Sequence, residues 1–268
     1  MQRTPPGAAD HDVMPQSDDP HSLLVPLFES LDAVGFGEHQ NIHHFNTGTL
    51  FWSLTRLFGC YERVMSVLPL PREERPFLEA DLEHYIVRFR IVLNDVAFVV
   101  RQLLPSEVRG LKGPSGGVHP RNREMSMFSL SKYLLKHPDS YPEFARAFSR
   151  TVDWMTRLKR DRDNVVHYKA KVVIFETSPS PSFAMHNAAG TERAVPTPNG
   201  GNRLLLEPVS EFVNTQMLSL HRFMHEELAL AIVEYSTRVG LKRQQVGWNH
   251  RIRCLGIERF RTINAIAA

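Results

Sequence analysis

The segment from Pro76 to Leu104 has the helical periodicity that most constrains how this chain can fold. Its apolar residues recur at steps of three and four, at Leu82, Ile86, Phe89, Leu93, Val96, Val100 and Leu103. That spacing places them along one side of an α-helix. A second apolar stripe, Val87, Ile91 and Phe98, falls on nearly the opposite side. A helix that is apolar on two sides lies centrally in a bundle or is shared with a second subunit. The segment therefore predicts a helical bundle and offers a dimer surface.

A polar seam runs between these two stripes at seven-residue steps, through Asp81, Arg88, Asp95 and Gln102. Residues seven apart lie close to one line along a helix, two turns from each other. One interpretation of the seam is a solvated face, and the other is a polar wall of a functional site. The pattern leaves both open.

Helical patterns recur on both sides of this segment. They lie at about residues 45–68, 125–136, 142–160 and 209–239. Gly240 follows the last of them as a C-cap. β-Branched and aromatic runs predict short strands at Val172–Phe175, Ser182–His186 and Arg203–Leu206. The expected fold class is mainly α, a helical bundle with a small β-hairpin insertion at about residues 171–206.

The two ends of the chain differ in composition from the middle. Residues 1–21 contain four prolines and four aspartates with little to bury, which is typical of a disordered tail. Residues 241–268 form a basic C-terminal segment. The expected helical domain therefore covers residues 22–240.

Positive charge is concentrated in two stretches, although the whole chain has a net charge of only +3. Between Arg146 and Lys171 eight basic residues stand against three acidic ones, and between Arg238 and Arg261 seven stand against one. Such clusters suit a polyanion, because neutralising phosphates releases counterions. Solvated charged faces are the alternative explanation.

Several classes of protein are excluded by composition. Uninterrupted apolar runs such as Val96–Val100 are far shorter than the roughly 20 residues of a membrane helix. The first twenty residues contain no apolar stretch of the kind found in a secretory signal. The only cysteines, Cys60 and Cys254, are too few for a disulfide scaffold. We expect a cytoplasmic protein with no membrane partner.

Two histidine pairs have the i, i+4 spacing that places both imidazoles on one helix face. They are His39 with His43, and His221 with His225. A zinc site needs three or four ligands, and no matching cysteine, histidine or glutamate set stands nearby in the sequence. The sequence therefore predicts no metal and no cofactor.

The segment from Arg160 to Tyr168 is the one constellation that suggests a specific chemistry. It reads Arg-Asp-Arg-Asp-Asn-Val-Val-His-Tyr and ends an amphipathic pattern inside the first basic cluster. Four residues separate Arg162 from His167, and six separate Arg160 from His167. This segment resembles the HEPN superfamily, whose mark is Arg and His separated by four to six residues, with Asn or Asp beside the Arg. The resemblance covers about residues 45–168.

The resemblance implies a fold and an activity. HEPN domains are helical bundles that commonly form homodimers, and their catalytic members are metal-independent ribonucleases. Many belong to toxin–antitoxin or other defence systems. The implied function is an endoribonuclease with Arg162 and His167 as catalytic residues, RNA as partner, and an antitoxin or regulatory protein as a further partner. The supporting residues would be Arg160, Asp163, Asn164 and Tyr168. One HEPN subgroup has tyrosine two residues after the histidine, where this chain has Lys169.

The residue types suit attack of a ribose 2′-hydroxyl on its own phosphate. The imidazole of His167 could take or give a proton near neutral pH. The guanidinium of Arg162 has a fork of donors that matches phosphate oxygens. Donors of this kind can stabilise a transition state by about 3 kcal/mol. Asp163 or Asn164 would hold Arg162 or cap the following turn.

Helix geometry limits how Arg162 and His167 can meet, because residues five apart on a regular helix point about 140° away from each other. Either Arg162 lies in a non-helical segment before a helix that bears His167, or the site combines residues from two subunits. Asp161 and Asp163 are good N-cap residues, which favours a helix that begins there.

Two other functions are compatible with the same residues. One is a non-catalytic RNA-binding or regulatory interaction module that uses the basic surface. The other is a structural helical domain whose tail and hairpin bind a protein partner. For Arg162, the structural alternative is an ion pair with Asp153 or Asp163 beside a hydrogen-bonded His167.

Overall fold

The computed structural model describes residues 40–105, 108, 126–167, 171–186, 194–196, 202–204 and 206–241. Within these ranges, the side chains of residues 40–47, 167, 186, 194–196, 202–204 and 225 are not described. The predicted tail at 1–21 and the basic segment after Leu241 lie outside the described residues.

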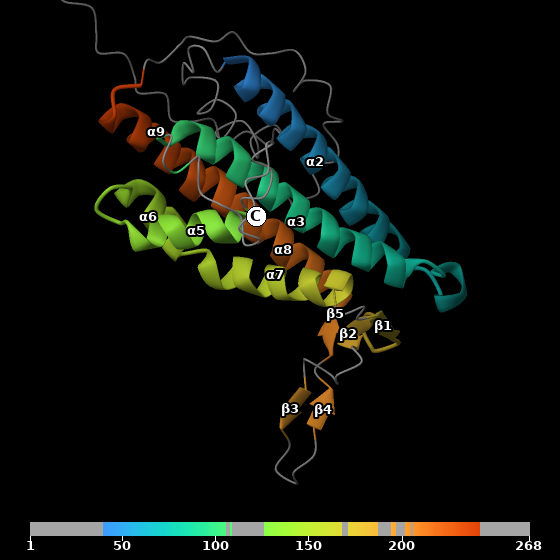
Figure 1. Cartoon of the computed structure of the whole chain (residues 1–268). Helices are drawn as coiled ribbons and strands as arrows, with labels where there is room; N and C mark the ends of the chain where they lie inside the picture. Colours follow the sequence, from blue (N-terminus) through green and yellow to red (C-terminus); the bar gives the residue numbers. More distant parts are fainter. Residues whose placement is uncertain are drawn as a thin grey trace, which may run out of the picture.

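The described chain is mainly helical, as the periodicity predicts, and its helices pack around α3 (Figure 1). Its helices are α2 (Gln40–Val67), α3 (Leu78–Leu103), α5 (Met127–Lys136), α6 (Pro142–Ser149), α7 (Val152–His167), α8 (Val209–Arg222) and α9 (Ala229–Arg238). A short 3₁₀ turn, η3 (Arg72–Glu74), joins α2 to α3, and these two long helices lie side by side. In the described ranges, no helix has both the length and the apolar character needed to cross a membrane.

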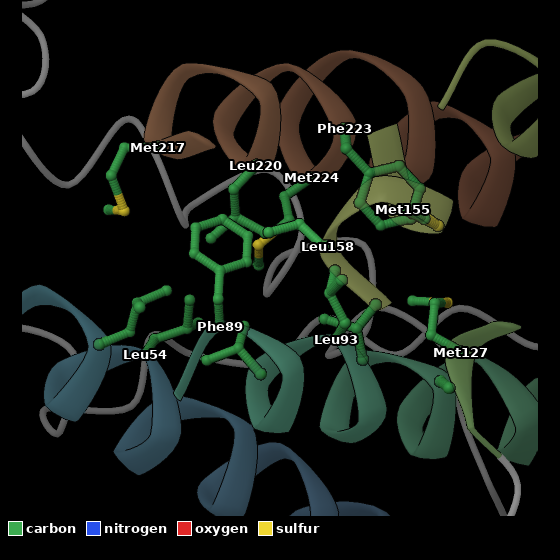
Figure 2. Packing of buried hydrophobic residues seen from close by; sticks show 14 of the residues in the cluster. Leu54, Phe89, Leu93, Met127, Met155, Leu158, Met217, Leu220, Phe223 and Met224 are labelled. Atoms are coloured by element: carbon green, nitrogen blue, oxygen red, sulfur yellow. The ribbon is translucent and has the colours of Figure 1, made fainter. Parts of the chain in front are cut away.

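The core lies where α3 meets α7 and α8. Phe89 and Leu93 of α3 are fully buried and point toward Leu220 and Phe223 on the opposite side of the core (Figure 2). The Phe89 ring also meets the ring of Trp154 edge-on at 5.8 Å between centroids. All seven residues of the first predicted stripe are buried, which confirms the central place of this helix. The second stripe is only half-buried.

The predicted helix at residues 142–160 is wrong in one respect, because α6 ends at Ser149 and α7 starts at Val152. The Thr151 hydroxyl donates to the carbonyl oxygens of Ala147 and Phe148, at 3.2 and 3.4 Å. A hydroxyl that occupies carbonyls of the preceding turn competes with the backbone bonds of a continuing helix. The break gives α7 a direction of its own. Helix α7 continues without interruption to His167. The prediction that a helix begins at Asp161 or Asp163 is therefore also wrong.

The predicted C-terminal helix is present but contains a π-helical segment, η4 (Phe223–Leu228), between α8 and α9. Gly240 ends α9 with φ of 68°, a left-handed conformation that favours glycine. The amide of Leu241 donates to the carbonyl of Ser236 at 3.0 Å, and the amide of Gly240 to that of Thr237 at 3.3 Å. These two bonds make a Schellman motif, which confirms the predicted C-cap.

The insertion after α7 is larger than the single hairpin that the sequence predicts. Strands β1 (Lys171–Phe175), β2 (Ser182–His186) and β5 (Glu207–Pro208) form an antiparallel sheet in the order β1-β2-β5. Strands β3 (Ala194–Pro196) and β4 (Asn202–Leu204) pair separately. The third predicted strand, Arg203–Leu206, overlaps β4 only at Arg203 and Leu204, and β5 begins one residue after it ends. Pro208 lacks an amide hydrogen, and β5 accordingly is a short edge strand.

The other edge of the sheet is closed by α3. The backbone amides of Val172 and Ile174 donate to Glu83 Oε1 and Glu79 Oε1, at 3.1 and 3.2 Å. Alternate residues of a strand lie about 6–7 Å apart, and so do residues four apart on a helix. The spacing of the two strand amides therefore matches the spacing of the two glutamates. On the opposite side, Arg157 of α7 donates to both carboxylate oxygens of Glu207, each at 2.6 Å. The sheet is therefore attached to both α3 and α7.

Replacing Glu83 with Ala is expected to lower the free energy of unfolding by about 1–3 kcal/mol, because the buried amide of Val172 loses its acceptor. Glu83→Gln retains an acceptor oxygen and should lose less. Urea titration followed by circular dichroism measures both variants, with Glu74→Ala at an exposed site as control. Equal stability of Glu83→Ala and the control would contradict the edge-closing role.

Candidate functional site

The last two turns of α7 contain Arg160, Arg162, Asp163 and Asn164, and His167 is the final residue of the helix. All belong to one uninterrupted helix, so the alternative in which Arg162 precedes the helix of His167 is wrong. Along this helix, positions 162 and 167 are about 140° apart around the axis, whereas positions 160 and 167 are only about 20° apart. The side chain of His167 and the whole of Tyr168 lie outside the described residues.

Arg162 is held by its neighbour in the chain. Its Nη1 donates to Asp163 Oδ1 at 3.0 Å, and its side chain is 29% exposed. The other carboxylate oxygen of Asp163 accepts from Lys159 Nζ at 2.9 Å. The ammonium of Lys159 also lies over the ring of Phe128, 5.3 Å from its centroid. The ion pair expected in the structural alternative is therefore present, and it fixes the guanidinium at the helix surface.

These two cations set the ionisation of Asp163. Partial burial alone would raise the pKa of this carboxyl, but hydrogen bonds from Lys159 and Arg162 outweigh it, and the pKa is lowered. The carboxylate therefore stays ionised throughout the neutral range and keeps its hold on both cations.

Asn164 and Asp161 face the interior instead of a surface site, with 3% and 1% exposure. Asp161 Oδ2 lies 3.9 Å from Arg157 Nε, one helical turn earlier. Arg160, by contrast, is exposed. Among the supporting residues predicted from sequence, Asp163 holds Arg162, Asn164 belongs to the packed face, and Arg160 lies on the solvent side of the helix.

Arg90 of α3 is a member of this cluster that the sequence analysis missed. Only 8% of it is exposed, and within the described part of the chain its Nη1 is buried without an acceptor. Burial lowers the pKa of this guanidinium, Asp163 raises it, and Arg162 lowers it further, with a net lowering. Arg90 of α3 is therefore close enough to α7 for the charges of Asp163 and Arg162 to act on it.

The signal for Arg90 was present in the sequence as a polar row on α3 at steps of four and seven: Glu79, Glu83, Arg90, Asn94 and Arg101. Glu79 and Glu83 bind β1, and Asn94 Oδ1 accepts from the amide of Met127 at the start of α5, at 3.3 Å. This row faces the sheet, α7 and α5.

The seam through Asp81, Arg88, Asp95 and Gln102 lies on the other side of α3, toward α2. Asp81 Oδ1 accepts from Arg63 Nε at 3.1 Å, and Asp95 is hydrogen-bonded to Ser53. Burial raises the pKa of Asp95 more than this bond from Ser53 lowers it. The seam therefore connects two helices and forms no wall of the α7 cluster.

The histidine pairs lie largely outside the description, because residue 39 and the side chains of His43 and His225 are not described. Among the residues that are described, no group of three or more histidine, cysteine, aspartate or glutamate side chains could hold a metal ion.

Comparison of the chain with protein-family models, with curated proteins and with solved structures gives no match.

Replacing Asp163 with Asn is expected to lower the free energy of unfolding at pH 7 by about 1–2 kcal/mol, because two charge-assisted hydrogen bonds are weakened. The pKa of Asp163 is lower in the folded protein than in the unfolded chain, where it is near 3.9. Its ion pairs therefore contribute fully to the free energy of unfolding above the unfolded-state pKa, and this contribution is lost as the pH falls through the folded-state pKa.

Urea titrations between pH 3 and pH 7 measure this effect. The difference between wild type and Asp163→Asn should be constant above about pH 5 and shrink below about pH 4. Asp139→Asn, at an exposed position in the turn before α6, is the control. A difference that is independent of pH would rule out the ion pairs as its cause.

Proposed function

We propose that this chain is a metal-independent endoribonuclease of the HEPN type that cleaves RNA with Arg162 and His167. The supporting observation is the arrangement of Arg162, which is partly exposed and fixed by Asp163 beside a second guanidinium, that of Arg90. Fixed cations at the surface of a rigid helix suit an anionic backbone. The assignment of His167, and the independence from metals, derive from the resemblance of the Arg-x4-His segment.

The proposed reaction is attack of a ribose 2′-oxygen on the adjacent phosphorus. A base removes the 2′-hydroxyl proton, the new P–O bond forms, the bond to the 5′-oxygen breaks, and that oxygen takes a proton. The products are a 2′,3′-cyclic phosphate and a 5′-hydroxyl. His167 would transfer protons, and Arg162 would stabilise the charge on the phosphorane.

The straight course of α7 favours a site made by two subunits. Arg162 and His167 of one chain diverge by about 140°, so one phosphate is reached by both only if they come from different chains. The half-buried stripe Val87, Ile91 and Phe98 on α3 would supply the dimer contact. Within one chain, Arg160 is on the side of His167 but about 10 Å away along the axis, and it would contact a neighbouring phosphate.

The second candidate function is a non-catalytic RNA-binding module of the same fold. It is favoured by the ion pair of Arg162 with Asp163, which already gives this arginine a structural role. A role in a toxin–antitoxin or defence system, with an antitoxin or regulatory protein as partner, rests on the resemblance alone.

Cleavage of labelled RNA in the presence of EDTA tests the proposed chemistry. Wild type should cleave, and His167→Ala should be slower by about 10²–10⁴-fold, because a positioned acid or base is lost. His84→Ala, at an exposed histidine of α3, should match wild type. Equal rates for wild type and His167→Ala would eliminate the assigned role of His167, and binding without cleavage would favour the module.

Mixed dimers test whether the site is shared. Arg162→Met and His167→Ala, each inactive alone, should recover about a quarter of wild-type activity when co-expressed, because half of the dimers contain one intact composite site of two. Two affinity tags allow the mixed dimer to be purified and assayed. Absence of recovery in a purified mixed dimer would place both residues in one chain.

A further inference from the structure

We propose that Arg90 is a phosphate-binding residue, and that it completes an anion site with Arg162 and Lys159 where α3, α5 and α7 meet. The proposal concerns a residue outside the Arg-x4-His segment. It rests on the proposed function for the identity of its ligand, an RNA phosphate, but its physical basis is independent of that function.

The first argument is the unmatched charge of Arg90. A guanidinium removed from water needs acceptors for its donors, and a buried ion without a partner is strongly unfavourable. Within the described residues the Nη1 of Arg90 is buried and has no hydrogen-bond partner, and only 8% of the residue is exposed. An arginine in this environment provides a binding position for an incoming anion.

The second argument is the distribution of charge around Asp163. This carboxylate is the acidic group that acts on Arg90, and both of its oxygens already accept from Lys159 and Arg162. Asp163 is therefore already bound by two cations while its charge also acts on Arg90. A phosphate of an RNA backbone, whose two non-bridging oxygens share one negative charge, would supply negative charge and acceptors for the guanidinium fork.

The third argument is the position of α5. Asn94, one turn after Arg90 on the same face of α3, accepts from the amide of Met127 in the first turn of α5. Ser126 caps that helix and accepts from the amide of Ser129 at 3.2 Å. The amino end of a helix is the positive end of its dipole. Its approach to the polar row of α3 adds to the attraction of an anion.

The same oxyanion is offered by an RNA backbone, a nucleotide and inorganic phosphate. The RNA backbone is the ligand to which we assign the site, because Arg162 belongs both to this cluster and to the proposed cleavage site. Arg90 on α3 would then bind the same phosphate as Arg162 and hold the strand against the face of α7.

Thermal unfolding with inorganic phosphate, at constant ionic strength, tests the site without RNA. The melting temperature of wild type should rise with phosphate concentration, because a ligand that binds only the folded state stabilises it. Arg90→Met should lose this rise, and its melting temperature without phosphate should equal or exceed that of wild type, because an unmatched buried charge is removed. Arg90→Lys should retain part of the rise.

Arg88→Met, two residues earlier on the side of α3 toward α2, is the matched control and should respond to phosphate as wild type does. The proposal is overturned if wild type shows no phosphate-dependent rise, or if Arg90→Met shows the same rise as wild type. A lower melting temperature of Arg90→Met without phosphate would also overturn it, because Arg90 would then be a structural residue.

Binding of a fluorescein-labelled single-stranded RNA identifies the source of the phosphate. Arg90→Met should bind about tenfold more weakly, and the slope of log K against log salt should fall by about 0.7, the value for one phosphate contact to a single strand. Unchanged RNA binding with loss of the phosphate response would exclude the RNA backbone as the ligand. The proposed nuclease function is tested separately by His167→Ala, so one proposal can fail while the other holds.

Discussion

Burial of α3 on most of its circumference is the constraint on which the rest of this structure depends. Its first apolar stripe packs into the core, and α2, α5, α7 and the sheet cover much of the rest, while the second stripe is only half-buried. A buried polar group on such a helix that has no hydrogen-bond partner raises the free energy of the folded state. Three polar residues of its inner row accordingly bind neighbouring elements: Glu79 and Glu83 bind β1, and Asn94 binds α5. Among the described residues, the Nη1 of Arg90 is buried without a hydrogen-bond partner, and this suggests a ligand.

The direction of α7 determines what its charged residues can do. The backward hydrogen bond of Thr151 ends the helical run after α6, and α7 begins as a separate helix. The last turns of α7 carry Arg162 and Asp163, whose charges act on Arg90. Because α7 continues unbroken to His167, positions 162 and 167 lie on different sides of the helix axis. The same helix therefore allows a fixed cation at Arg162 and argues against a site within one chain. The nuclease site that we propose on this helix would therefore combine two copies of the chain.

Much of the fold was predictable because apolar periodicity reports directly on which side of a helix is buried. The central helix, the short strands β1 and β2, and the Gly240 cap were predicted from local pattern, and the structure confirms them. The break at Thr151 was missed because a threonine hydroxyl can point to solvent or bond backward, and the sequence does not choose. Arg90 was missed because its sequence context does not distinguish it from an exposed helical arginine. Only the packing of other elements against α3 buries it.

The sequence by itself determined the mainly helical class, the central place of residues 78–103 and the concentration of charge near the end of α7. Those properties are local, since composition and helical spacing do not depend on distant parts of the chain. Only the tertiary structure decided which charges meet, because helix packing brings α3 against α7 although 48 residues separate the end of one from the start of the other. It placed Asp163 between Arg162 and Lys159, turned Asn164 inward, and buried Arg90 beside them.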